Sequence, residues 1–133
     1  MSAIDFALRG RLNTFAGLLA VRDRIFPNIL PQAVQVPCIK FQVHNDIPSD
    51  TIEGKAGLFN AIVSFEIYAG SALQARSLAD QVRLALQGWS GTSATVVVRG
   101  SHIIDESNGF DAVVKNYTHG LRFSVWYNRT NPS

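Results

Sequence analysis

The sequence predicts a single α+β domain over residues 1–133, in which an N-terminal helix precedes the order β-β-α-β-β. Three observations support this fold class. Apolar residues recur at helical spacing in two stretches, they alternate with polar residues in the stretches between and after these, and the length suits one hydrophobic core. We therefore expect the central helix to pack on a four-stranded, mainly antiparallel sheet.

Residues 1–20 form the predicted N-terminal helical segment. Apolar side chains recur there every three or four positions, which places them on one helix face: Ile4, Leu8, Leu12, Phe15 and Leu19. Ser2 is placed to cap this helix, and Gly10 and Gly17 are expected to divide it into two pieces.

Residues 21–37 form a predicted proline-rich arm, because Pro27, Pro31 and Pro37 are three of the five prolines in the chain. Each proline ring fixes φ and removes an amide donor, so the arm is expected to be extended, to follow the domain edge and to stay outside the sheet. Two explanations of the arm remain open. It can be held ready for a neighbouring subunit, or it can simply route the chain from helix to sheet.

Two strands are predicted after the arm. Residues 39–44 alternate between apolar and polar side chains, with Pro37 marking the start, and residues 61–69 repeat this alternation over a longer stretch. The polar segment between them, residues 45–57, predicts a long projecting connection.

The central helix is predicted between Ser71, which forms a capping box with Gln74, and Gly88. A third strand runs from Val96 to Ile104 and is expected to turn at residues 105–111. The last strand covers residues 117–127, and residues 128–133 are expected to fray. If the helices cover one face of the sheet, its other face is a candidate contact surface that carries Lys40, Tyr68, Arg122 and Trp126.

Composition favours a subunit that hides surface against partners. Only 17% of residues are charged, and nine arginines accompany three lysines. The net charge of +2 comes from scattered basic residues, which is not typical of nucleic-acid binding. No apolar run approaches the roughly 18 residues of a membrane span, and no signal peptide is evident, so we expect synthesis in the cytoplasm and no membrane contact.

No catalytic, metal or cofactor site is predicted. His44, His102 and His119 fall on three different strands, and Cys38 is expected to be a packing residue. The Gly88–Ser93 stretch lacks the spacing of a nucleophile elbow, and the adjacent carboxylates Asp105 and Glu106 are expected in a solvated turn.

Four features together resemble a known family: the N-terminal helix, "RIFPNILPQ" followed by "VPCIKFQV", the helix "ALQARSLADQVRLALQG" after "SFEIYAGS", and the closing "LRFSVWY". The chain resembles the tail completion, or tail terminator, proteins of long-tailed double-stranded DNA bacteriophages over nearly its whole length. The resemblance implies a structural virion protein, made in the bacterial host cytoplasm, and no enzyme activity.

The resemblance also implies a task and partners. Subunits of such proteins form a ring, usually hexameric, that caps the head-proximal end of the tail tube, ends tube polymerisation and offers a surface to the head-tail connector. The expected partners are therefore further copies of the chain, the major tail tube protein and connector proteins. Phage DNA passes through such a ring without sequence-specific binding.

Candidate assembly contacts follow from expected exposure. Axial contacts are assigned to the loop at residues 46–57 and the turn at residues 105–115, and lateral contacts to the central helix and the sheet. The arm adds two further residues. The full set is Arg24, Phe26, Asp50, Glu53, Lys55, Arg76, Arg83, Asp105, Glu106, Arg122 and Trp126.

Two alternatives remain open. A head-completion or connector adaptor protein would also form rings, and it would bind portal complexes instead of tube ends. A small nucleic-acid-binding α+β module would use exposed aromatic residues on its sheet to stack bases.

Overall fold

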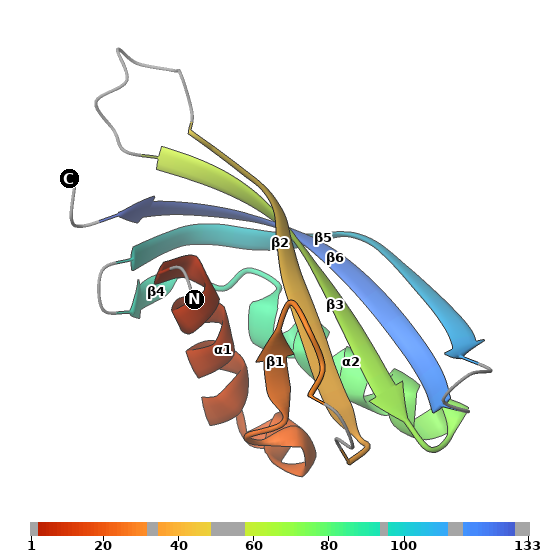
Figure 1. Cartoon of the computed structure of the whole chain (residues 1–133). Helices are drawn as coiled ribbons and strands as arrows, with labels where there is room; N and C mark the ends of the chain where they lie inside the picture. The colour runs from red at the N-terminus through yellow and green to blue at the C-terminus, as the bar shows by residue number, and fades with distance from the viewer. Residues whose placement is uncertain (1–2, 32–34, 49–57, 94–95, 112–115, 130–133) are drawn as a thin grey trace.

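The computed structural model describes residues 3–31, 35–48, 58–93, 96–111 and 116–129. Figure 1 shows long, strongly curved strands with the helices gathered on one side of them. The elements in chain order are α1 (Ala3–Thr14), a 3-10 helix η1 (Ala16–Val21), β1 (Ile25–Pro27), β2 (Cys38–Pro48), β3 (Leu58–Ala69), α2 (Ala72–Leu86), β4 (Gly91–Ser93), β5 (Val96–Asp111) and β6 (Asn116–Arg129).

The predicted α+β class is confirmed, but within the described residues the sheet has six strands where four were expected. Their order is β1-β2-β3-β6-β5-β4. β1 pairs with β2 in parallel, and every other neighbouring pair is antiparallel. The two additional strands, β1 and β4, have three residues each, which is too short for an alternating pattern to appear in the sequence.

One hydrophobic core lies between the helices and the inner face of the sheet. Alternate residues of β3 and β6 are buried there against apolar residues of α1, η1 and α2. Phe65 is at the centre, with its ring 5.9 Å from the rings of both Phe41 and Phe123. Each such ring pair contributes about 0.5–1.5 kcal/mol beyond its buried area, so this aromatic row joins β2, β3 and β6 firmly.

The N-terminal helical segment is divided at a different place from the one predicted. α1 continues through Gly10, and the break falls at Phe15, before η1. Gly17 lies inside η1, against the side chain of Gln81 on α2, where a Cβ atom would collide with the Gln81 amide. Gly17 therefore permits close packing of η1 on α2 instead of breaking a helix. The predicted cap Ser2 lies outside the described residues.

The prediction that the arm stays outside the sheet was wrong. Ile25, Phe26 and Pro27 pair with Ile39, Lys40 and Phe41. β1 is an edge strand, and the backbone nitrogen of Pro27 lies on its outer side, where no neighbouring strand needs a donor. A proline, which has no N–H, is therefore tolerated there. The arm thus does route the chain onto the sheet edge.

The predicted turn at residues 105–111 was also wrong. β5 continues through these residues to Asp111, paired with β6 throughout. Residues 105–109 include no buried side chain, because both faces of this part of β5 are exposed, and their polar and glycine residues resembled a turn in the sequence. β6 extends to Arg129, so Asn128 and Arg129 belong to the strand and not to a frayed tail. Tyr68, expected on an exposed face, is buried.

Candidate assembly surfaces

α2 is fixed at both ends. At its start the Ser71 hydroxyl accepts a hydrogen bond from the Gln74 amide (3.1 Å), and the Gln74 side chain accepts one from the Gly70 amide (3.2 Å). The first contact confirms Ser71 as the predicted cap, but the reciprocal bond of a capping box is not formed, because Gln74 reaches the amide of Gly70 and not that of Ser71. At its end Gly88 has φ +72°, and its amide donates to the Ser101 carbonyl of β5 (2.7 Å). α2 is therefore held in a defined position relative to β5.

A β-bulge in β5 decides where its two carboxylates point. Ile103 pairs with Phe123 on the core side, Ile104 is the extra residue, and Asp105 pairs with Arg122. The bulge therefore turns Asp105 to the outer face of the sheet and Glu106, the next residue, to the helix side. The adjacent pair predicted for one turn is divided between two surfaces.

On the helix side, Glu106 contacts Arg83 of α2. Arg83 Nη2 donates to Glu106 Oε2, while Arg83 Nη1 donates to Asp80 Oδ1 (2.9 Å). The hydrogen bond from Arg83 holds the pKa of the Glu106 carboxyl below its ordinary value, and burial opposes this shift. The same hydrogen bond raises the pKa of Arg83. His119 Nε2 lies 3.7 Å from Glu106 Oε2 and, among the described atoms, makes no hydrogen bond.

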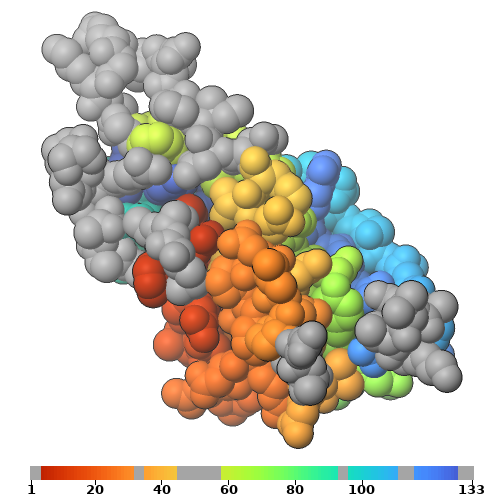
Figure 2. Space-filling model, viewed as in Figure 1, coloured from red at the N-terminus to blue at the C-terminus, as the bar shows by residue number. Residues whose placement is uncertain are grey.

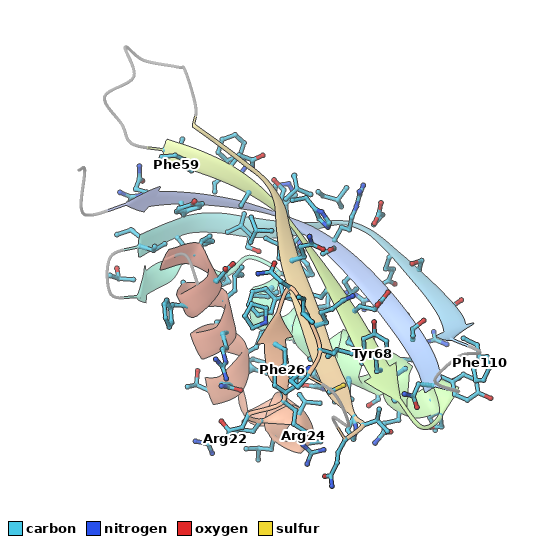
Figure 3. The ribbon with its side chains drawn as sticks, viewed as in Figure 1. Arg22, Arg24, Phe26, Phe59, Tyr68 and Phe110 are labelled. Carbon is cyan, nitrogen blue, oxygen red and sulfur yellow. The ribbon has the colours of Figure 1, made fainter. Side chains whose placement is uncertain are left out.

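Next to this ion pair lies a cleft of about 810 Å³ between the start of α2 and the β5–β6 hairpin. We call it the α2 cleft; Arg76 and Glu106 line it together with three exposed apolar residues. These are Leu73, Phe110 and Tyr117, with 79%, 53% and 39% of their surface exposed. The rings of Phe110 and Tyr117 meet edge to face, 5.0 Å apart. Figure 3 shows Phe110 at the end of the hairpin.

The outer face of the sheet forms a second hollow, of about 610 Å³, across β2, β3, β6 and β5. Its floor is polar and carries two cross-strand ion pairs. Arg122 Nη2 lies 3.1 Å from Asp105 Oδ2, and Lys40 Nζ lies 3.7 Å from Glu66 Oε1. We call this hollow the outer groove; Trp126 lies further along the same face of β6, paired with Gly100.

The β1 edge is the third surface. Arg24 Nη1 donates to the Pro37 carbonyl (3.4 Å), and Phe26 is half-buried. Figure 3 shows both of these residues, with Arg22, well apart from Phe110. Ile29, just after β1, is 77% exposed.

The predicted contact residues therefore divide among three surfaces. Arg76, Arg83 and Glu106 come together at the α2 cleft, Asp105 and Arg122 at the outer groove, and Arg24 and Phe26 lie on the β1 edge. Trp126 lies on the same outer face as Arg122 but does not line the outer groove. Asp50, Glu53 and Lys55, with most of the predicted loop at residues 46–57, lie outside the described residues, as do residues 112–115 of the predicted turn.

Sequence reasoning missed the apolar members of the α2 cleft. Leu73 lies off the apolar stripe of α2, and Phe110 follows a polar run; these two departures from pattern were the available signals. Cys38 is buried as expected, and burial raises the pKa of its thiol to about 11. Among the described residues there is no group of three metal-ligating side chains and no helix long and apolar enough to cross a membrane.

The fold is shared with a component of a virus-like particle. A chain from the solved virion of a native gene transfer agent particle matches with a TM-score of 0.63 and 15% identity, over 90% of each chain. No curated protein sequence matches this chain.

The family model for Tail completion protein gp17 matches residues 7–128. The chain therefore belongs to this family, and the resemblance inferred from its sequence is confirmed. It is a structural protein of a bacteriophage tail and a component of the virion, and its family is not an enzyme family.

Proposed function

We propose that copies of this chain form a ring, hexameric when assembled, that caps the head-proximal end of the tail tube. The ring ends tube polymerisation and gives the head-tail connector a surface to join. The observation that carries this proposal is the family match over residues 7–128, with tail completion as its description.

The geometry supports termination because the subunit has unlike faces. A terminator must match the last tube layer on one surface and fail to match another layer elsewhere. The outer groove is a bare, polar sheet face with exposed ion pairs, whereas the opposite face of the sheet is covered by helices (Figure 1). Exposed ion pairs of this kind select a partner and its register more than they supply binding energy.

The proposed partners are further copies of the chain, the major tail tube protein and connector proteins. Phage DNA passes through the ring without sequence-specific contact. The low net charge of +2 suits such passage, since sequence-independent attraction to DNA grows with the number of phosphate contacts made by basic residues.

Tube growth in vitro tests the proposal. Purified protein is added to polymerising tail tube protein, and tube lengths and the position of a gold label on the added protein are read by electron microscopy. We expect label at one end of each tube and an end to growth at that end. Growth that continues unchanged would contradict termination. In a parallel mixture to which portal complexes are added, label on those complexes instead of on tubes would also contradict it and would indicate an adaptor.

A charge-reversal pair gives the matched control. Arg122→Glu should weaken capping by placing a carboxylate beside Asp105, and Arg122→Glu combined with Asp105→Arg should recover part of it. If the single and double variants cap tubes equally well, the outer groove is not part of the contact surface.

A further inference from the structure

We propose that residues 28–31 of one subunit dock into the α2 cleft of the next. We call these four residues, which directly follow β1, the arm tip. The inference rests on the ring of the proposed function and names the contact through which one copy recognises another.

The arm tip presents an apolar side chain on a fixed backbone. The Asn28 amide donates to the Phe41 carbonyl (2.7 Å), the Ile29 amide donates to the Pro27 carbonyl (2.8 Å), and Asn28 has φ +70°. These contacts hold the backbone while the Ile29 side chain stays 77% exposed. A tip that is already ordered loses little conformational freedom when it binds.

The α2 cleft offers a matching surface. Leu73 lies on one wall, and the edge-to-face rings of Phe110 and Tyr117 lie on the other, all of them exposed. Aromatic residues clustered around a hollow are typical of the few interface positions that dominate binding. An aliphatic side chain such as Ile29 would remove all three from water.

The positions of the two surfaces require the partner to be a separate copy. β1 is at one end of the strand order, while β5 is next to the other end and is covered there by β4 only along Val96–Val98. Figure 2 shows the orange arm exposed on the surface, apart from the blue residues of β5 and β6. A contact between two unlike patches at opposite edges is head-to-tail, and such a contact generates a ring when its rotation closes.

The charges around the two surfaces are complementary. On the same β1 edge, at the start of β1, Arg22 and Arg24 have no carboxylate within ion-pair distance in the part of the chain that the structure describes. Beside the cleft, the Asp80 and Glu106 carboxylates share Arg83 and remain 52% and 39% exposed. Arg76 also lines the cleft, so the charge complementarity is limited to the part of the rim that carries Asp80 and Glu106. The exposed carboxylate oxygens are free to accept from a neighbour's arginine.

Site-directed photo-crosslinking tests this contact. A Leu73→Cys variant is labelled with benzophenone-maleimide; Cys38 does not compete because it is buried and its pKa is raised to about 11. The labelled protein is mixed with unlabelled protein, with and without tail tube protein, and irradiated. We expect adducts between two copies of the chain, mapped by mass spectrometry to residues 26–31. The matched control is Leu84→Cys, also exposed on α2 but outside the cleft, which should give no adduct at those residues.

A substitution in the unlabelled copy checks the tip itself. Ile29→Asp should reduce the adduct yield by about tenfold or more, because it places a carboxylate among apolar side chains, whereas Leu84→Asp should leave the yield unchanged. Since Ile29 is exposed, its replacement should leave the fold intact, which circular dichroism would check. Adducts with the tube protein, equal adducts from the Leu84→Cys control, or no adduct in either mixture would overturn the inference.

The outcome separates this contact from the proposed function. Capped tubes without the crosslink would refute the docking and leave termination standing. Crosslinked copies on tubes that keep growing would support the docking and refute termination.

Discussion

Glu106 and Asp105 are neighbours in the chain but act on different surfaces. The extra residue at Ile104 lets Asp105 pair with Arg122 on the outer face while Glu106 reaches Arg83 on the helix side. The alternation of the strand gives each surface one carboxylate, and the inserted residue decides that Asp105 faces outward and Glu106 faces the helices. Removal of Ile104 would shift the register and turn every later side chain of β5 to the opposite face.

Glu106 makes stability depend on pH. Because the folded state lowers the pKa of Glu106 below its ordinary value of 4.5, its stabilising contribution is present above that pH and is lost as the pH falls through the lowered pKa. Glu106→Gln should reduce the free energy of unfolding at pH 7 by about 0.2–1 kcal/mol, the range for an exposed ion pair. Urea unfolding at pH 7 and at pH 3 measures this difference, which should shrink at the lower pH.

Arg83→Met supplies the control for that prediction. In this background Glu106→Gln should change stability much less, because the principal partner of the carboxylate is gone. An equal effect of Glu106→Gln in both backgrounds, or a difference that grows toward pH 3, would show that Arg83 is not the source of the pKa shift.

For single residues, the sequence predicted which side chains are exposed better than it predicted which residues they contact. The polar positions of α2 and β6 placed Arg76, Arg83 and Arg122 on accessible faces, and the structure agrees. The ion pair between Arg83 and Glu106 depends on the bulge in β5, and the residues around that bulge carry no sequence signal that predicts it. The exposed position of Leu73 was not predicted to matter, because leucine has a high helix propensity on any face of a helix.

Among the elements, α2 is the one whose ends the sequence defines most completely. Ser71 supplies the first turn with a hydrogen-bond acceptor, Gln74 accepts from the amide of Gly70 before the helix, and Gly88 adopts the left-handed conformation that ends the helix. The walls of the α2 cleft depend on this placement, since Leu73 and Arg76 lie in the first turns of the helix.

Ser71→Ala should therefore destabilise the protein by about 1 kcal/mol, because the Gln74 amide loses its acceptor. Ser71→Asp should recover most of that loss, since aspartate caps as well and its charge suits a helix N-terminus. The midpoint of urea unfolding measures both, with an unchanged slope expected. Ser77→Ala, in the exposed middle of the same helix, is the control and should be nearly neutral; a loss equal to that of Ser71→Ala would exclude capping as the cause.

The longer strands were predictable because one side of each is buried. β2, β3 and β6 alternate clearly, and their buried residues form the aromatic row of the core. β1 and β4 escaped prediction because three residues give no period, and the distal half of β5 escaped because it is an exposed edge with no buried side to mark it.

For the whole molecule, the asymmetry of the sheet is the central feature. One edge ends in a proline-containing strand followed by an exposed isoleucine, and near the other edge lies a cleft with exposed aromatic rings. The sequence indicated a subunit of an assembly through its low charge content and its family resemblance. The positions of these two edges could not be predicted from the sequence, because they follow from the strand order and not from any local pattern.

The most direct measurement of the proposed function is the tail length in lysates of a phage whose copy of this gene carries an early stop codon. The proposal predicts tubes of irregular, excessive length that carry no heads, and normal tails when the protein is supplied from a plasmid. Tails of normal length joined to heads in the absence of the protein would contradict it.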